Sequence, residues 1–171
     1  ITVRGAQDML NVATGIVEQV KNVETPQTIE LVAKLARTAS DIHATLGNLE
    51  QAYESAKSSK DLLEPLHLAA PNDPKFLSLL YHSFWRMGDA IADRDTRRST
   101  QEHALKVFLE AEQLARQMAA MTPEDGDRKG HIVFVLQKIG DVRQSVNDWP
   151  TAIAVYSDAL NISQDVADRA P

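Results

Sequence analysis

Residues 136–160, LQKIGDVRQSVNDWPTAIAVYSDAL, contain the pattern that decides the fold of this chain. The stretch predicts two helices joined by a short turn at Asn147 and Asp148, with Pro150 in the first turn of the second helix, where proline is favoured. Gly140 lies in the first predicted helix and Ala152 in the second. Because small side chains at these two places let helix backbones approach closely, the stretch predicts a helix hairpin.

The same layout recurs upstream with a regular spacing. An alanine opens each second helix, and successive alanines are separated by 46, 52 and 48 residues: Ala6, Ala52, Ala104 and Ala152. The residues four, seven and ten positions after each alanine are apolar or small, and these offsets lie on one face of a helix. A period between about 20 and 50 residues is typical of stacked structural units.

The first helix of each unit has its own signature. A small residue is followed directly by an aspartate in all three units: Ser40–Asp41, Gly88–Asp89 and Gly140–Asp141. The small residue precedes the alanine of the second helix by twelve residues in the first and third units and by sixteen in the middle unit. We therefore expect the polar loop at residues 94–99 to hold four extra residues.

These motifs support a resemblance to a known repeat family. Leu136, Ile139 and Gly140, then Ala152, Tyr156, Ala159 and Pro171, resemble the tetratricopeptide repeat, whose usual form is W-x2-L-G-x2-Y, then A-x3-F, then P. The middle unit matches similarly at Phe84, Met87, Gly88, Ala104, Phe108, Ala111 and Pro123. The phrases LQKIGDV and AIAVYSDALNISQDVADRAP are similar to a long-period variety, of about 48 residues, in large bacterial multidomain proteins. This resemblance implies a setting beside signalling, TIR or nucleotide-binding domains.

The predicted fold is an all-α solenoid of antiparallel helix hairpins, with about seven helices and a right-handed superhelix. We expect one domain over residues 1–171, divided into a half unit (1–25) and three units (26–73, 74–125 and 126–171). The predicted helices cover residues 3–24, 27–46, 49–69, 75–93, 100–121, 131–146 and 150–169, and residues 123–130 form a polar linker. Ser99 or Thr100 is expected to cap the fifth helix, and Trp149 to pack between neighbouring units. The first helix has a wide apolar stripe: Met9, Val12, Ala13, Ile16, Val17 and Val20.

Composition limits the possible functions. The net charge of −6 disfavours general binding of nucleic acid or of an anionic membrane, and no apolar stretch is long enough to span a bilayer. The chain has no cysteine, which fits a cytoplasmic location. It begins with Ile1 rather than methionine, so we expect a fragment of a larger protein.

No residue pattern predicts catalysis. The five histidines form no metal-binding motif, and the segment Asp125–Asp127 lacks the alternating oxygen ligands of a calcium loop. Asp93 and Asp95 lie among arginines, which predicts a surface charge cluster rather than an acid–base pair. We expect no enzyme activity, no metal and no cofactor.

The candidate binding surface is the concave face, which first helices line in such a stack. The residues three and six before the small residue, and the one after it, are expected to face the groove and bind a partner: Lys34, Arg37, Asp41, His82, Trp85, Asp89, Phe134, Gln137 and Asp141. Exposed aromatic residues beside polar neighbours are natural interaction hot spots, so Trp85 and Phe134 stand out. Both also suit a core position, and the aspartates are equally suited to bridging adjacent helices.

Two main functions follow. The first is a protein–protein interaction scaffold that binds a peptide or helix in its groove, within a larger cytoplasmic signalling or regulatory protein. The second is a regulatory domain that senses a small ligand through His82, Trp85 and Asp89 and acts on a linked catalytic domain. Self-association through the unpaired first helix or the C-terminal end is a third possibility.

Overall fold

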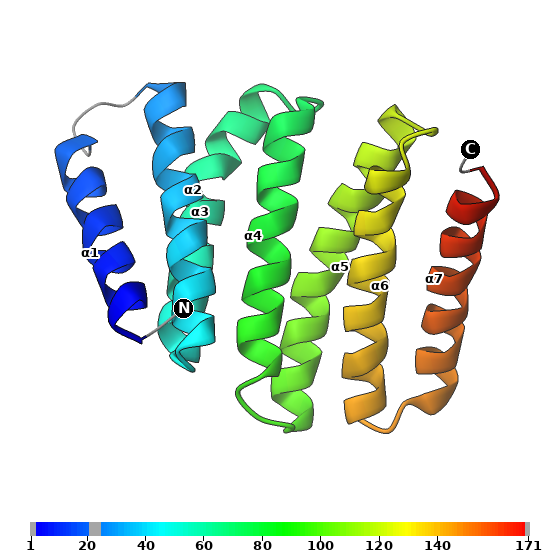
Figure 1. The fold of residues 1–171 in the computed structure, drawn as a ribbon. Coiled ribbons are helices and arrows are strands. Elements are labelled where there is room, and N and C mark those ends of the chain that lie inside the picture. The colour runs from blue at the N-terminus through cyan, green and yellow to red at the C-terminus, as the bar shows by residue number, and fades with distance from the viewer. Residues whose placement is uncertain (1–2, 21–24, 170–171) are drawn as a thin grey trace.

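The computed structural model describes residues 3–20 and 25–169. This part of the chain contains seven helices and no strand (Figure 1): α1 (Val3–Val20), α2 (Pro26–Thr45), α3 (Leu49–Ala69), α4 (Pro74–Ala92), α5 (Arg98–Met121), α6 (Gly126–Ser145) and α7 (Trp149–Arg169). Helices α2 to α7 form three hairpins, α2–α3, α4–α5 and α6–α7, and each hairpin packs on the next. The all-α helical-repeat solenoid predicted from the sequence is confirmed.

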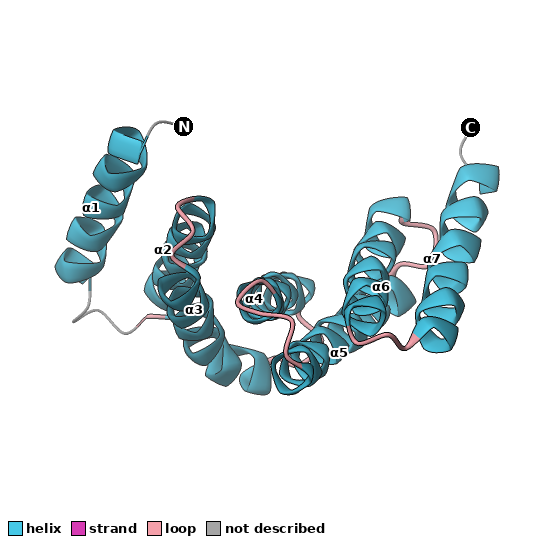
Figure 2. Cartoon of the chain, turned by 90° about the horizontal axis from the view of Figure 1, so that it is seen from below, coloured by secondary structure: helices cyan, strands magenta, loops and turns pink. Residues whose placement is uncertain are grey.

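The hairpins are arranged in an arc. Viewed along the helices, α2, α4 and α6 lie on the inner side of the arc, and α3 and α5 lie on the outer side (Figure 2). Besides the contacts between consecutive helices, α2 touches α4 and α4 touches α6. The first helices of the hairpins therefore form a continuous concave face.

The small residues act as predicted. Ala52, Ala104 and Ala152 are buried, and so are Gly88 and Gly140 on the facing helices. A β-carbon added to Gly88 would lie 2.7 Å from Cδ1 of Phe108, and one added to Gly140 would lie 2.6 Å from Cζ of Tyr156. In the first hairpin the glycine is replaced by Ser40, whose hydroxyl donates to the carbonyl of Ala52 at 2.7 Å. In each hairpin the second helix thus lies directly against the small residue of the first.

Threonine and aspartate side chains cap the N-termini of the first helices of the three hairpins. Thr25 accepts from the amide of Thr28, Asp73 from that of Lys75, and Asp125 from that of Arg128. The last of these corrects a prediction, because α6 begins at Gly126 rather than at residue 131. Once Asp125 caps the helix, the glycine-rich segment 126–130 joins its first turns instead of forming a linker.

The middle hairpin accommodates its extra residues partly as helix. Helix α5 begins at Arg98, so Ser99 and Thr100 lie in its first turn, and the predicted cap at these two residues is wrong. The inserted turn places Gln101 in a buried position, where its Nε2 donates to the carbonyls of Ala92 and Asp95 at 2.8 and 2.7 Å. Its Oε1 accepts from Ser145 of α6 at 3.1 Å. Gln101 therefore links the end of α4 to the third hairpin.

Two predicted packing roles are corrected. Trp149 does not pack between units, because it is the first residue of α7 and half of its surface is exposed. Among the described side chains of α1, Ala6 and Leu10 are buried and contact Ile42, whereas Met9 and Val12 of the predicted apolar stripe are exposed. The side chains of Val17 and Val20, and the predicted helical residues 21–24, lie outside the described residues.

Candidate functional site: the concave face

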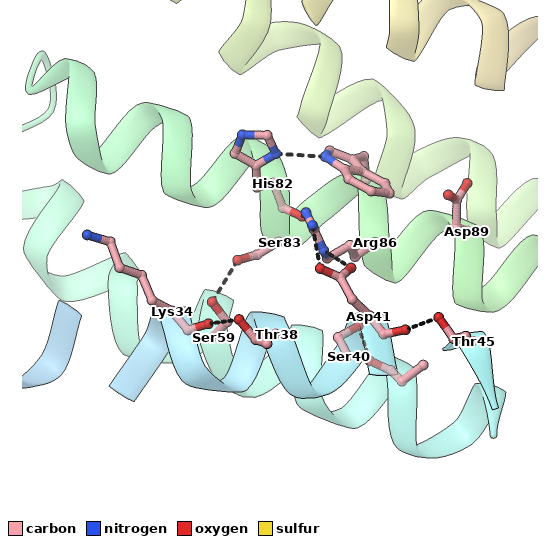
Figure 3. A network of polar contacts seen from close by, with 12 residues as sticks. Lys34, Thr38, Ser40, Asp41, Thr45, Ser59, His82, Ser83, Arg86 and Asp89 are labelled. Carbon is pink, nitrogen blue, oxygen red and sulfur yellow. Dashed lines mark hydrogen bonds and ion pairs between the residues drawn. The ribbon is translucent and has the colours of Figure 1, made fainter. Parts of the chain in front are cut away.

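The repeated aspartates of the first helices bind the next hairpin. Asp41 of α2 accepts two hydrogen bonds from the guanidinium of Arg86 on α4, one of them from Nη2 at 2.8 Å (Figure 3). Asp89 of α4 pairs with Nζ of Lys138 on α6, at 2.9 Å. Each cation lies two residues before the glycine of its own helix. The two ion pairs therefore repeat at equivalent positions and connect three consecutive hairpins.

Aromatic rings lie beside these ion pairs. The rings of Trp85 and Phe134 meet edge to face, with centroids 5.1 Å apart, across the boundary between α4 and α6. The guanidinium of Arg86 lies 4.2 Å from the centre of the Trp85 ring, and Nζ of Lys138 lies 5.5 Å from that of Phe134. Such cation–π contacts hold the rings in fixed orientations. Phe134 is 36% exposed and Trp85 is half-buried.

His82 completes the arrangement around Trp85. Its Nδ1 accepts a hydrogen bond from Nε1 of Trp85 at 3.0 Å, and its ring lies 5.6 Å from that of His131. Burial, followed by the nearby charges of Arg37 and Arg86, lowers the pKa of His82 to about 4. The neutral imidazole is therefore the form that the fold selects, since the protonated ring would have no lone pair for Trp85.

At the α2 end of the face, the charges are also paired. The buried carboxylate of Glu30 bonds to Nζ of Lys34 at 2.5 Å and to Nζ of Lys75 on α4. The hydrogen bond from Lys34, followed by that from Lys75, lowers the pKa of Glu30. Arg37 is half-buried, and burial together with the charge of Arg86 lowers the pKa of its guanidinium. This end of the face is basic at Lys34 and Arg37.

At the α6 end, the face opens into a cleft. Asp141 accepts from the hydroxyl of Tyr156 at 2.6 Å, a bond within the same hairpin. Phe134 and Gln137 border a cleft of about 270 Å³ that Gly130 leaves open on the α6 side and that Ser163 bounds on α7. Gln137 is exposed.

The nine predicted residues thus fall into two groups. Asp41 and Asp89 bond to cations of the next hairpin, which favours the bridging alternative for both, and His82 accepts a hydrogen bond from Trp85 within α4. A half-buried or exposed surface is presented by the others: Lys34, Arg37, Trp85, Phe134, Gln137 and Asp141. Their part in binding a partner stays a prediction.

Sequence reasoning missed two members of the face, Arg86 and Lys138, although both form its ion pairs. The sequence does contain a pattern that identifies both residues. Each is a basic residue two positions before the glycine, and each aspartate follows the small residue of the preceding unit. Matching these two positions between neighbouring units would have identified both pairs.

The described residues contain no cluster of three or more histidine or acidic side chains placed to hold a metal ion. None of the helices described is both long and apolar enough to cross a membrane. The polar groups of the concave face bond mainly to one another, an arrangement that fits a rigid surface.

Two carboxylates of the face, Asp89 on α4 and Glu30 on α2, are expected to respond differently to neutralisation. Burial raises the pKa of Asp89 despite its bond to Lys138, so the free energy of unfolding falls as the pH rises from the ordinary carboxyl pKa through that raised pKa. We expect Asp89→Asn to change the free energy of unfolding at neutral pH by about 0.5 kcal/mol or less, since the side chains of Lys138 and Asp89 are 31% and 27% exposed. Urea titration of the variant at pH 7 measures this change.

Glu30→Gln is the matched comparison. The pKa of Glu30 is lowered, so its contribution is present at neutral pH and is lost as the pH falls through the lowered pKa. This variant should lose about 1 kcal/mol at pH 7. An equal or larger loss for Asp89→Asn than for Glu30→Gln would contradict the assignment.

Comparisons with known proteins identify no family for this chain. No protein-family model matches it, and no curated protein matches it. Two solved structures, each a crystal structure of MamA, align over 96% and 95% of this chain and over 94% and 96% of the other chain. Both are 12% identical to it in sequence, with TM-scores of 0.28 and 0.25. Likeness at this level carries no argument about function, and the repeat architecture rests on the chain's own packing.

Proposed function

We propose that this chain is a non-enzymatic protein-interaction scaffold that binds a peptide or a helix of a partner protein on its concave face. The observation that carries the proposal is the edge-to-face pair of Trp85 and Phe134, partly exposed and held by Arg86 and Lys138. A fixed aromatic surface loses little conformational entropy when it binds, so it favours affinity. Basic groups at Lys34 and Arg37 on one side, and the cleft beside Gln137 on the other, extend this surface along the groove.

The proposal includes the setting of the chain. We place the scaffold in a larger cytoplasmic signalling or regulatory protein, and this placement rests on the resemblance to long-period tetratricopeptide arrays. The small-ligand alternative receives less support, because Nδ1 of His82 and the carboxylate of Asp89 are already bonded to Trp85 and Lys138.

Peptide selection followed by titration tests the concave site. A displayed random peptide library is selected on the immobilised chain, and the affinity of an enriched peptide is measured by fluorescence anisotropy. Phe134→Ala is expected to weaken binding by about tenfold, because it removes an exposed ring that packs against Trp85 on this surface. Leu109→Ala is the matched control, since Leu109 is a similarly exposed apolar side chain on α5, a helix on the outer side of the arc (Figure 2).

Intrinsic fluorescence adds a direct readout. The chain has two tryptophans, so Trp149→Phe leaves Trp85 as the only one, and its emission should shift when the groove is filled. Enriched peptides that leave Trp85 emission unchanged and bind Phe134→Ala as well as the parent would refute the concave site.

A further inference from the structure

The last hairpin has an end face, on the side of α7 away from the other two hairpins. In the first and second hairpins the corresponding surface is covered by the helices of the next hairpin. Position by position, Ser163 of α7 corresponds to Leu63 of α3 and Ala115 of α5. Leu63 and Ala115 are fully buried in the core, whereas Ser163 is exposed. The first two hairpins therefore bury a surface that the third leaves open.

Two apolar side chains show the same difference. Ile153 corresponds to Tyr53 and Leu105, and it is 63% exposed, whereas Leu105 is buried and Tyr53 lies under the guanidinium of Arg94. Leu160 is 57% exposed, at the position that Lys60 occupies in α3. Large apolar residues thus replace polar or covered ones on a face that has no cover within the described chain.

The charge pattern is also incomplete at this end. Asp41 pairs with Arg86 of the following helix, and Asp89 pairs with Lys138 of the next one. Asp141 is the third aspartate of the series, and within the described residues its partner is the hydroxyl of Tyr156 rather than a cation. A helix packed here as α4 and α6 pack on their predecessors would bring a basic residue opposite Asp141.

We propose that this end face, formed by Asp141, Ile153, Leu160 and Ser163, docks a basic amphipathic helix of a partner protein. The proposal follows from continuity with the two established interfaces, α4 on α2–α3 and α6 on α4–α5. In both, the docked helix has its cation two residues before a glycine and a buried aliphatic residue six positions before the cation, namely Leu80 and Ile132. The chain's net charge of −6 also favours a basic partner.

A second copy of the chain does not supply such a helix. Its first candidate would be α2, which already packs on α1 and has Thr38 at the position of Arg86 and Lys138. Helix α4 already packs on α2 and α3 of the first hairpin, and α6 already packs on α4 and α5 of the second. A helix from outside residues 1–171 therefore fits this face better than a second copy of the chain does.

A synthetic peptide with the sequence of residues 126–145 is a suitable probe, because in the protein this helix covers the equivalent face of α4–α5. We expect the fluorescein-labelled peptide to bind the whole chain saturably by anisotropy. Leu160→Glu in the chain should weaken binding by about tenfold. Leu68→Glu is the matched control, since Leu68 is an exposed leucine on α3 outside this face.

The charge register gives a sharper test. Asp141→Lys should weaken binding of the peptide, and a peptide carrying Lys138→Glu should bind the Asp141→Lys chain better than it binds the parent chain. Circular dichroism confirms that each variant is folded. Failure of the parent peptide to bind, or binding indifferent to both Leu160→Glu and the charge exchange, would overturn the proposal. A concentration-dependent dimer that Leu160→Glu abolishes, seen by light scattering, would assign the face to self-association instead.

Discussion

Replacing Gly88 by alanine is expected to lower the free energy of unfolding by about 1–3 kcal/mol. The added methyl group would lie between 2.5 and 2.8 Å from three carbons of the Phe108 ring. Phe108 is almost fully buried in the main core, so its ring has no open space into which to move. The overpacking therefore outweighs the gain of about 0.5–1 kcal/mol that alanine normally brings to a helix interior. Urea denaturation followed by circular dichroism measures the change.

Gly130→Ala is the control for that variant. Gly130 also lies inside a helix, but no atom is within 4 Å of the position that its β-carbon would occupy. This substitution should stabilise the chain by about 0.5–1 kcal/mol. A Gly88→Ala variant as stable as Gly130→Ala would show that α4 and α5 do not approach as closely as described.

A double substitution tests the same contact from the other side. The first hairpin places Ser40 and Ala56 where the second has Gly88 and Phe108, so a larger residue on one helix accompanies a smaller one on the other. In Gly88→Ala combined with Phe108→Ala, the added methyl group no longer meets a ring. The combined loss should be smaller than the sum of the two single losses by about 1 kcal/mol or more.

This complementarity explains why the sequence was sufficient to predict the fold. Close helix packing restricts residue size, and a size restriction is visible in a sequence whenever the same contact recurs. The buried alanines Ala52, Ala104 and Ala152 and the two glycines opposite aromatic residues repeat at nearly constant spacing. A solenoid whose units differed more in length would not have given this signal.

The concave face was less predictable, because its contacts depend on which side chains of neighbouring units meet. A repeat pattern places Asp41 on the face, but whether it binds a ligand or Arg86 depends on the distance between α2 and α4. The start of α6 was missed for a local reason. Glycines at 126 and 130 suggested a linker, and the capping bonds from Asp125 outweighed their low helix propensity.

Helix α1 shows a further limit. The apolar or small residues that follow Ala6 have the same spacing as those of the other second helices, and Ala6 is buried as expected. Yet a cleft of about 350 Å³ separates Val12 and Ile16 from Leu35 of α2. In the later hairpins the residue at the position of Leu35 packs on the preceding helix, as Ser83 does through its bond to Ser59. The repeat spacing therefore predicted that α1 is a helix, but it did not predict how closely α1 packs on α2.

The pH dependence of stability depends largely on His82. Its pKa in the folded chain is about 4, against an ordinary value of 6.5, and burial is the main cause. Between about pH 6.5 and pH 4 the unfolded chain binds a proton at this residue and the folded chain mostly does not. The free energy of unfolding should therefore fall as the pH decreases from 6.5 towards 4, while at pH 7 and above His82 has little effect.

Between pH 7 and pH 5 the expected loss from His82 is about 1–2 kcal/mol, allowing for the partial solvent exposure of its ring. His82→Asn should remove most of it, because the amide oxygen can accept the hydrogen bond from Trp85 and does not titrate. The pKa values of His43 and His131 are also lowered by burial, so a smaller dependence should remain. His103→Asn is the matched control, since His103 is exposed on α5.

Urea denaturation of the three chains at pH 7 and pH 5 separates the contributions. The parent chain and His103→Asn should lose similar stability on acidification, and His82→Asn should lose less. Equal losses in all three chains would mean that the imidazole of His82 is protonated as easily in the folded state as in the unfolded one. In that case its Nδ1 could not be the acceptor for Trp85, and the aromatic surface that carries the proposed function would lose the bond that orients its larger ring.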